Sequence, residues 1–181
     1  AANGINRPDK RRTASSALNA QDVDLYVFTK EGVFLYDAVK HALNPLKAGD
    51  YRKEIAMARP PRPAGSPSPA SPGGPGPGAA PAGAPPSGPP PGGPATSAPI
   101  NIVLVSDNAR FGGGTPELKK EWGAIDTGIV SQNISLFCAA RGLGTRPRAS
   151  IDKDKVRTLL QLRDSQFPIL EHPVGYRVET K

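Results

Sequence analysis

Short apolar runs along the chain predict its strands. Residues 25–28 and 33–36 are apolar and rich in aromatic and β-branched side chains, and a Lys-Glu-Gly turn separates them, so they predict a β-hairpin. Residues 99–105 are almost continuously apolar, which is typical of a strand covered on both faces. A last strand is predicted over residues 168–174.

A longer periodic pattern predicts a helix over residues 116–141. Pro116 and Glu117 suit a first helical turn, and Gly142 suits the position just after the last turn. Apolar side chains recur through this stretch at near-helical spacing. They are Trp122, Ile125, Ile129, Leu136, Phe137 and Ala140.

Weaker signals predict two shorter helices. Ser150 can cap a helix that runs to Leu162, with Val156, Leu159 and Leu160 facing inward. Asp50 can cap another that runs to Ala58. Residues 1–24, 37–46 and 106–115 are expected to be irregular connections. The alternation of strands and helices indicates an α/β or α+β domain with a helix-flanked sheet.

The composition changes this picture at one place. Of the 22 prolines, 16 lie between residues 60 and 99, together with nine of the 20 glycines and a single charge. Such a segment buries too little apolar surface to offset its ordering entropy, so we expect residues 59–98 to be a disordered insert. It would separate residues 1–58 from residues 99–181 of one domain, which is large enough for one modest core.

Charge and residue counts exclude several kinds of function. The net charge is +7, but the basic residues are scattered, which favours a solvated surface over a nucleic-acid or membrane interface. One cysteine and two histidines exclude an intramolecular disulfide and a cysteine- or histidine-rich metal centre. No run is long enough to span a membrane, and no signal-peptide pattern is present, so we expect a cytoplasmic protein.

Individual motifs give only weak evidence for a particular chemical function. The segment 13–21 carries hydroxyls and amides that could bind a planar heterocycle, although an ordinary polar loop explains it as well. Gly142, Gly144 and Arg148 could approach a phosphate, but a helix stop also accounts for Gly142. Asp126 could be a general base or a carboxylate at a helix N-terminus, Cys138 fits a core position, and no hydrolase constellation is present.

Taken together, several segments are more specific than any one alone. Residues 1–9 (AANGINRPD), 12–21 (RTASSALNAQ) and 24–27 (DLYV) resemble the small FMN-dependent nitroreductases. So do residues 123–133 (GAIDTGIVSQN), 142–144 (GLG) and 173–176 (PVGY). The resemblance covers nearly all of residues 1–58 and 99–181, and only the insert has no counterpart.

The resemblance implies an α+β fold with a central, mostly antiparallel sheet flanked by helices. It also implies a homodimer with FMN at the subunit interface, held by both chains. The flavin would take a hydride from NAD(P)H and reduce a small-molecule acceptor such as a nitroaromatic or a quinone. Because the flavin carries the chemistry, no catalytic side chain and no metal are expected.

The resemblance also assigns cofactor-binding residues. Ser16, Asn19 and Gln21 fall in the loop that meets the flavin, while Arg148 and Ala149 fall in the segment whose backbone approaches the central ring. Arg177 and Lys181 occupy the region of basic phosphate contacts. Gln132 and Asn133 on the long helix could face the cofactor or the dimer partner. The full list is Ser16, Asn19, Gln21, Arg148, Ala149, Arg177 and Lys181.

Three departures from the family leave other functions open. Ser15 stands where the family usually has proline, the insert is additional, and the sequence begins after the family's arginine-rich phosphate motif. A non-catalytic remnant of the same fold, acting as a dimerisation or binding module, is therefore one alternative. Another is an interaction protein whose proline-rich insert binds SH3- or WW-like domains.

Overall fold

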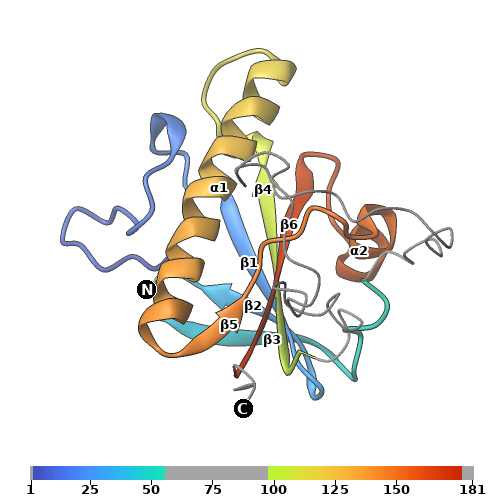
Figure 1. Ribbon diagram of the computed structural model, residues 1–181. Helices are drawn as coiled ribbons and strands as arrows, with labels where there is room; N and C mark the ends of the chain where they lie inside the picture. The colour runs from blue at the N-terminus through green and yellow to red at the C-terminus, as the bar shows by residue number, and fades with distance from the viewer. Residues whose placement is uncertain (1, 56–97, 177–181) are drawn as a thin grey trace, which may run out of the picture. The chain divides into compact units, whose positions relative to one another are not determined.

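The computed structural model describes residues 2–55 and 98–176 (Figure 1). In this part of the chain the strands form one antiparallel sheet in the order β3-β2-β1-β4-β6-β5. The strands are β1 (Val23–Phe28), β2 (Gly32–Asp37), β3 (Ala42–Ala48), β4 (Ile100–Asp107), β5 (Leu143–Thr145) and β6 (Gln166–Tyr176). The helices are α1 (Pro116–Ala140) and α2 (Lys153–Leu160), with short 3-10 helices η1 (Ala17–Asn19) and η3 (Asn108–Arg110). The predicted α+β class is confirmed.

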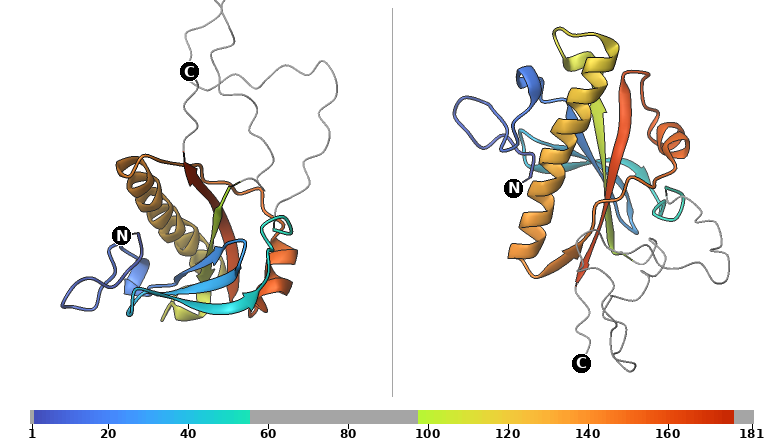
Figure 2. Two further views of the ribbon diagram at one scale, coloured as in Figure 1. Left: turned by 90° about the horizontal axis from the view of Figure 1, so that it is seen from below. Right: turned by 45° about the horizontal axis from the view of Figure 1, so that its top comes forward.

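Strand β4 forms the centre of the molecule, and its two faces belong to different cores. Leu104 packs with Leu25 of β1 and Ile134 of α1 on one face. Val103 and Val105 pack with Val156 of α2 on the other. All three β4 side chains are fully buried, which confirms the prediction of a strand covered on both faces. Figure 2 shows the two helices on the two sides of the sheet.

The predicted hairpin is β1–β2, and pairing of β1 with β4 joins residues 2–55 to residues 98–176 in one sheet. Two strands were not predicted. Residues 42–48, expected to be part of a connection, form the edge strand β3, whose residues are all exposed. Its Pro45 pairs with Phe34 beside a register shift, which an edge strand tolerates because the missing N–H can face outward. Residues 143–145 form β5 at the opposite edge.

The two short helices differ from their predictions. Residues 51–55 form turns instead of a helix, and Asp50 forms an ion pair with Arg52 at 2.7 Å instead of capping one. The second helix, α2, begins at Lys153 rather than after Ser150. Its cap is Asp152, whose carboxylate accepts a hydrogen bond from the Lys155 N–H at 3.1 Å. Ser150 is followed by Ile151, which enters the core and so delays the helix.

Helix α1 is confirmed at both ends. Thr115 caps its start by accepting a hydrogen bond from the Leu118 N–H at 3.3 Å, and Gly142 has a left-handed φ of 68° just after its end. The apolar spacing that predicted the helix does not mark its buried face. Ile125 and Leu136 are 54% and 59% exposed. The side chains that face the sheet are mostly small or polar. They are Gly123, Asp126, Thr127, Val130, Ser131, Ile134 and Cys138.

Two features of the sequence fall outside these observations. The insert predicted over residues 59–98 lies, except for Ala98, outside the described residues, and so do residues 56–58 of the predicted first short helix. No helix within residues 2–55 or 98–176 is long and apolar enough to cross a membrane.

The inward face of α1 makes a stability prediction. Ile134 is 4% exposed and packs in the core beneath α1, so Ile134→Ala should lower the free energy of unfolding by about 2–5 kcal/mol. Val39→Ala is the control, because Val39 is 70% exposed in a turn, and it should change stability by less than about 0.5 kcal/mol. Urea denaturation followed by circular dichroism measures both, and equal effects would contradict the described orientation of α1.

Candidate functional site

The loop before β1 has an unusual backbone. Leu18, Asn19 and Gln21 all have left-handed φ values between 50° and 52°, a conformation that costs a non-glycine residue free energy. Ser16 closes the loop, because its hydroxyl oxygen accepts a hydrogen bond from the Gln21 N–H at 2.9 Å. Strained backbone of this kind is concentrated at ligand-binding loops, where surrounding contacts hold it in place.

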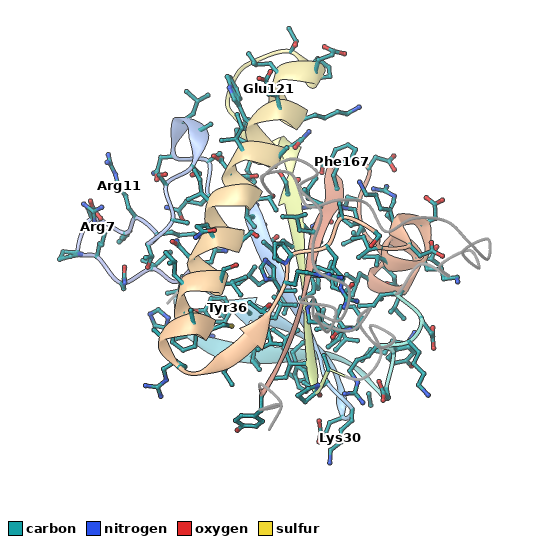
Figure 3. The ribbon with its side chains drawn as sticks, in the orientation of Figure 1. Arg7, Arg11, Lys30, Tyr36, Glu121 and Phe167 are labelled. Atoms are coloured by element: carbon teal, nitrogen blue, oxygen red, sulfur yellow. The ribbon has the colours of Figure 1, made fainter. Side chains whose placement is uncertain are left out.

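The predicted residues of this loop differ in solvent exposure and in hydrogen bonding. The Asn19 side chain is exposed and makes no hydrogen bond to the other described residues, so its amide can offer both a donor and an acceptor to a ligand. Gln21 is half-buried, and its Nε2 donates to the Lys10 carbonyl at 3.0 Å. Arg7 and Arg11 lie at the outer rim of the neighbouring loop (Figure 3) and form ion pairs with Asp9 at 3.2 and 3.9 Å.

Buried carboxyls attach this loop to α1. Asp126 accepts a hydrogen bond from the Ala17 N–H, the first residue of η1, at 2.8 Å. This is the helix-terminus role that the sequence left open for Asp126. Asp22, fully buried, accepts a hydrogen bond from the Ser106 hydroxyl at 2.5 Å. Burial, and the neighbouring Asp126 carboxyl, raise the pKa of Asp22 to about 7, although the hydrogen bond from Ser106 acts to lower it.

The second predicted group lies on the segment between β5 and α2. The backbone of Arg148 pairs with Glu171 of β6 through two hydrogen bonds of 2.8 Å. The Arg148 side chain is half-buried, and its Nε has no hydrogen-bond partner. Ala149 is exposed. This segment therefore fixes its position through β6 and leaves Arg148 and Ala149 at the surface of the sheet edge.

The two predicted groups do not meet within one copy of the chain. The N-terminal loop and the segment after β5 lie on opposite flanks of α1 in Figures 1 and 2. Between them, Gln132 is exposed on α1, while Asn133 is half-buried and donates to the Ala2 carbonyl at 3.3 Å. Arg177 and Lys181, the predicted phosphate contacts, lie outside the described residues.

A buried histidine, not predicted as a functional residue, joins three elements. His172 of β6 is fully buried, with Nε2 at 2.8 Å from the Ser131 hydroxyl of α1 and Nδ1 at 3.1 Å from the Thr145 hydroxyl of β5. Burial lowers the pKa of His172 to about 4. A neutral imidazole has one N–H donor and one nitrogen acceptor. One hydroxyl can accept a hydrogen bond from the ring N–H, and the other can donate to the unprotonated ring nitrogen. Nothing in the local sequence indicates this role, because the three residues are distant in the chain.

Two more polar side chains are buried without partners on the α2 face of the sheet. Glu171 and Asn101 are fully buried, and their side-chain oxygens and the Asn101 amide nitrogen have no hydrogen-bond partner. Burial raises the pKa of Glu171, and the charge of nearby Arg148 opposes this. Burial therefore disfavours the charged carboxylate at this position.

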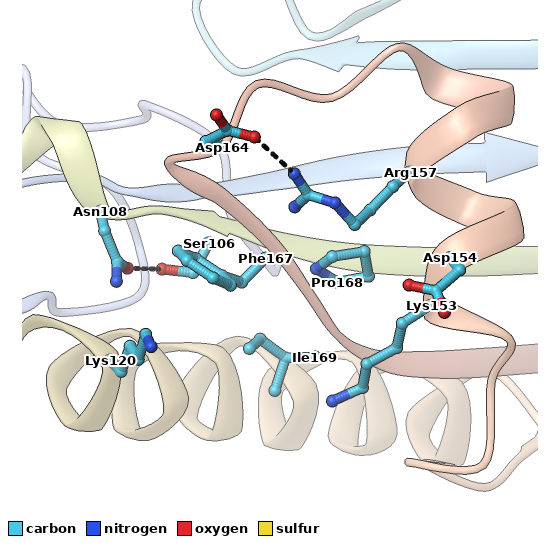
Figure 4. Close-up of a pocket in the computed structure, with 10 residues that line it drawn as sticks. All are labelled: Ser106, Asn108, Lys120, Lys153, Asp154, Arg157, Asp164, Phe167, Pro168 and Ile169. Atoms are coloured by element: carbon cyan, nitrogen blue, oxygen red, sulfur yellow. Dashed lines mark hydrogen bonds and ion pairs between the residues drawn. The ribbon is translucent and has the colours of Figure 1, made fainter. Parts of the chain in front are cut away.

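A groove of about 400 Å³ lies between α1 and α2 along the edge of β6 (Figure 4). Its apolar floor comes from Phe167, Pro168 and Ile169, and Lys120 and Lys153 stand on its two sides. Arg157 also lines it, but it is already paired with Asp164 at 3.3 Å. None of the predicted site residues within the described part of the chain lines this groove.

The edge of β6 along this groove is poorly suited to pairing with another strand. Pro168 has no N–H to donate, and the pairing with β4 is irregular between Leu170 and Pro168. The Gln166 carbonyl already accepts a hydrogen bond from Arg157 at 2.6 Å. Proline, a bulge and a basic side chain are common protections of an open sheet edge. Within the described part of the chain, no group of three or more His, Cys, Asp or Glu residues could hold a metal ion.

Comparisons with known proteins identify the relatives of this chain. The sequence model of the Nitroreductase family matches residues 1–176. Among solved structures, a chain from Ralstonia eutropha described as a nitroreductase has a TM-score of 0.70 at 23% identity, covering 99% of this chain and 70% of that one. A nitroreductase family protein from Streptococcus pneumoniae has a TM-score of 0.55 at 18% identity, covering 93% and 76%.

A third structural relative belongs to an assembly. A chain of the Escherichia coli microcin synthetase McbBCD complex, solved with truncated pro-MccB17 bound, has a TM-score of 0.65 at 13% identity, covering 98% of this chain and 61% of that one. At these identities the structures show a shared fold. Curated protein sequences gave no match.

The buried His172 makes a pH prediction. Its pKa lies near 4 when folded and near 6.5 when unfolded, so the stability it supports is complete above pH 6.5 and is lost as the pH falls towards 4. At about 1.4 kcal/mol per pH unit, the loss approaches about 3 kcal/mol. We expect His172→Gln, which keeps a hydrogen-bonding side chain without this titration, to lack that loss. Urea denaturation of both proteins between about pH 4 and pH 7.5 measures the difference, and parallel curves would contradict it.

Proposed function

The chain belongs to the nitroreductase family, and from this premise we propose that it is an FMN-dependent oxidoreductase that uses NAD(P)H. The family in general supports a flavin oxidoreductase with this fold. The proposal for this chain adds the cofactor, the hydride source and the class of acceptor, a nitroaromatic or quinone-like small molecule. A cytoplasmic location fits an enzyme that draws on NAD(P)H.

The observation that carries the proposal is the strained loop before β1. This loop holds Leu18, Asn19 and Gln21 in a left-handed backbone conformation. It also presents the side-chain amide of Asn19, which has no hydrogen-bond partner among the described residues. The rim of an isoalloxazine ring has both hydrogen-bond donors and acceptors, and a side-chain amide can match either kind. Preorganised loops of this kind place a ligand without paying for loop ordering at the moment of binding.

The other assigned residues would complete the site. Ser16 fixes the loop and keeps its own O–H available as a donor, because its oxygen is the acceptor for Gln21. Arg148 and Ala149 lie on a segment fixed by β6, where backbone groups and the Arg148 guanidinium could approach a ring edge. Arg177 and Lys181 would contribute charge-assisted contacts to the phosphate.

When bound, FMN would supply the two-electron chemistry between NAD(P)H and the acceptor. The protein would bind, orient and shield the reacting groups. This division of work agrees with the absence of a predicted acid–base or nucleophilic constellation. It also explains why the assigned residues are amides, hydroxyls and basic groups instead of paired carboxylates.

We also propose that the active form is a homodimer. On the outer side of α1, apolar side chains recur at intervals of three, four and seven residues. The exposed members are Leu118, Ile125 and Leu136, with Trp122 and Ile129 half-buried among them. A stripe of this kind is typical of a helix that packs against another helix. Because the two assigned groups flank this stripe in one copy, a second copy is needed to bring them to a common site.

Removing the Asn19 amide tests the cofactor. We expect Asn19→Ala to bind FMN at least about fivefold more weakly than the wild-type chain and to retain correspondingly less after desalting, because a lost hydrogen-bonding group in a dry site costs about 1–3 kcal/mol. The visible absorption band of the flavin measures retention. Asn44→Ala on the exposed strand β3 is the control and should retain as much flavin as the wild type.

Equal retention by the two variants would remove Asn19 from the site. No flavin retained by the folded wild-type chain would favour the alternative of a non-catalytic module.

Charges on the outer side of α1 test the dimer. We expect Ile125→Lys combined with Leu136→Lys to give a monomer at micromolar concentration, because burying unpaired charge in an apolar interface is unfavourable. Leu43→Lys, at 47% exposure on β3, is the control and should leave the mass unchanged. Sedimentation velocity measures the mass. A wild-type chain that is already monomeric would contradict the dimer.

A further inference from the structure

We propose that the groove between α1 and α2 binds an aromatic carboxylate. The ring of the ligand lies on the apolar floor formed by Phe167, Pro168 and Ile169. Its carboxylate lies between the side chains of Lys120 and Lys153. No described residue assigned to the flavin lines this groove, so the inference goes beyond the proposed function and does not depend on it.

A bulge in β6 shapes the floor of the groove. Consecutive pairs of the β4–β6 ladder are Leu104 with Leu170 and Val105 with Pro168, so Ile169 has no partner on β4. A bulged residue leaves the regular alternation of its strand, and bulges are frequent beside binding sites because they redirect a side chain. Here the redirected side chain, Ile169, lines the groove. A small ligand suits this edge better than a peptide strand, because Pro168 has no N–H for strand pairing.

The size and the floor of the groove suit a ligand with one or two aromatic rings. Its volume of about 400 Å³ lies in the range of small-molecule sites, about 300–1,000 Å³. Phe167 and Ile169 are only half-buried, so a ligand can still remove apolar surface from water. An aromatic ring gains from contact with Phe167 beyond the area that it buries, and it has fewer torsions to immobilise than a flexible chain.

Several hydrogen-bond donors around this floor are not engaged by other described residues. Lys120 and Lys153 form no ion pair with any of them. The Lys120 ammonium lies 5.5 Å from the centroid of the Phe167 ring, so it stands beside the floor. The side chain of Asn108 uses only its oxygen, at 3.3 Å from the Ser106 hydroxyl, and its amide N–H₂ is available. An anion rich in acceptors is the complement of these donors.

The acidic groups of the groove leave these donors unopposed. Asp164 forms an ion pair with Arg157 at 3.3 Å, and Arg157 also donates to the Gln166 carbonyl at 2.6 Å. Asp154 lies in the first turn of α2, where the helix dipole favours a negative charge. In Figure 4 the Lys153 side chain extends toward α1, whereas Asp154 lies toward α2. The positive charge is therefore concentrated on the α1 side of the groove, where the carboxylate of the ligand lies.

Titration of the flavin-free chain with 2-naphthoate, followed by proton–nitrogen correlation spectra, tests the site. We expect saturable shifts of the amide signals of Asn108, Phe167 and Ile169, which line the groove. The neutral amide 2-naphthamide has nearly the same shape without the charge, so it should bind at least about threefold more weakly. Signals from the outer side of α1, such as those of Ile125 and Leu136, should not move.

Two lysine variants separate the charge from the floor. Lys120→Gln and Lys153→Gln should each weaken 2-naphthoate binding by about two- to fivefold, the factor that a partly exposed ion pair contributes, and should leave 2-naphthamide binding unchanged. Both lysines are exposed, so both variants should fold. Lys155→Gln is the matched control, because it removes the same charge from α2 outside the groove, where Lys155 is paired with Asp152 at 3.2 Å.

A variant of the floor has the opposite signature. Ile169→Ala removes apolar contact without changing charge, so it should weaken 2-naphthoate and 2-naphthamide by the same factor. No binding of 2-naphthoate at millimolar concentration, or equal affinity for the two ligands, would overturn the proposal. So would a loss of affinity in Lys155→Gln as large as in Lys120→Gln and Lys153→Gln, or shifts confined to the outer side of α1.

Flavin retention separates this inference from the proposed function, because the two sites use different residues. Binding of 2-naphthoate in the groove by a chain that retains no FMN would support the groove and contradict the flavin site. Retention of FMN by a chain that does not bind 2-naphthoate would support the flavin site and contradict the groove.

Discussion

The close approach of α1 to the sheet governs the arrangement of the whole molecule. Gly123 lies where no side chain fits, Ser131 contacts the buried His172, and Asp126 holds the Ala17 N–H. Each of these contacts requires a particular residue at a particular angle around the helix. The helix therefore cannot rotate to bury its apolar residues without leaving buried polar groups unpaired, which costs more than a single exposed apolar side chain.

This orientation leaves the apolar side of α1 at the surface, between the two assigned groups of residues. The polar side of α1 is used for folding, so the apolar side chains Ile125 and Leu136 remain outward. The loop before β1 and the segment after β5 are fixed on the two flanks of the helix by independent contacts, with Asp126 in one case and β6 in the other. An apolar helix face with hydrogen-bonding groups on both flanks is suited to pack against another protein surface and to bind a ligand beside it.

The sequence predicted the elements that are marked by apolar residues close together in the chain. Strand β4 and the β1–β2 hairpin follow from dense apolar runs, and α1 follows from its period and its ends. Strand β3 could not be found, because all its residues are exposed and Pro45 interrupts the pattern. The inward face of α1 could not be found either, since small and polar residues carry it and their partners are remote in the chain. The resemblance placed Asn19 in the loop expected to meet the flavin, and the structure shows that its side chain is exposed and its backbone strained. Nothing local in the sequence linked Asp126 to the Ala17 N–H, because the two residues are far apart in the chain.

Two buried titratable groups, His172 of β6 and Asp22 before β1, respond to pH in opposite directions. His172 must remain neutral, so acid weakens the contact between β6 and the middle of the helix. Burial raises the pKa of Asp22 to about 7, so the stability that its protonated form supports falls as the pH rises towards that value, where the loop meets Ser106 of β4. Neither group is exposed, so neither effect can be relieved by solvent without moving the helix or the loop. In the folded chain His172 is neutral above about pH 4 and Asp22 keeps its proton below about pH 7, so both buried groups are uncharged between these values. Because His172 contacts α1 and β5 whereas Asp22 contacts β4, acid acts first on the contact between the helix and the sheet, and alkali acts first where the loop joins β4.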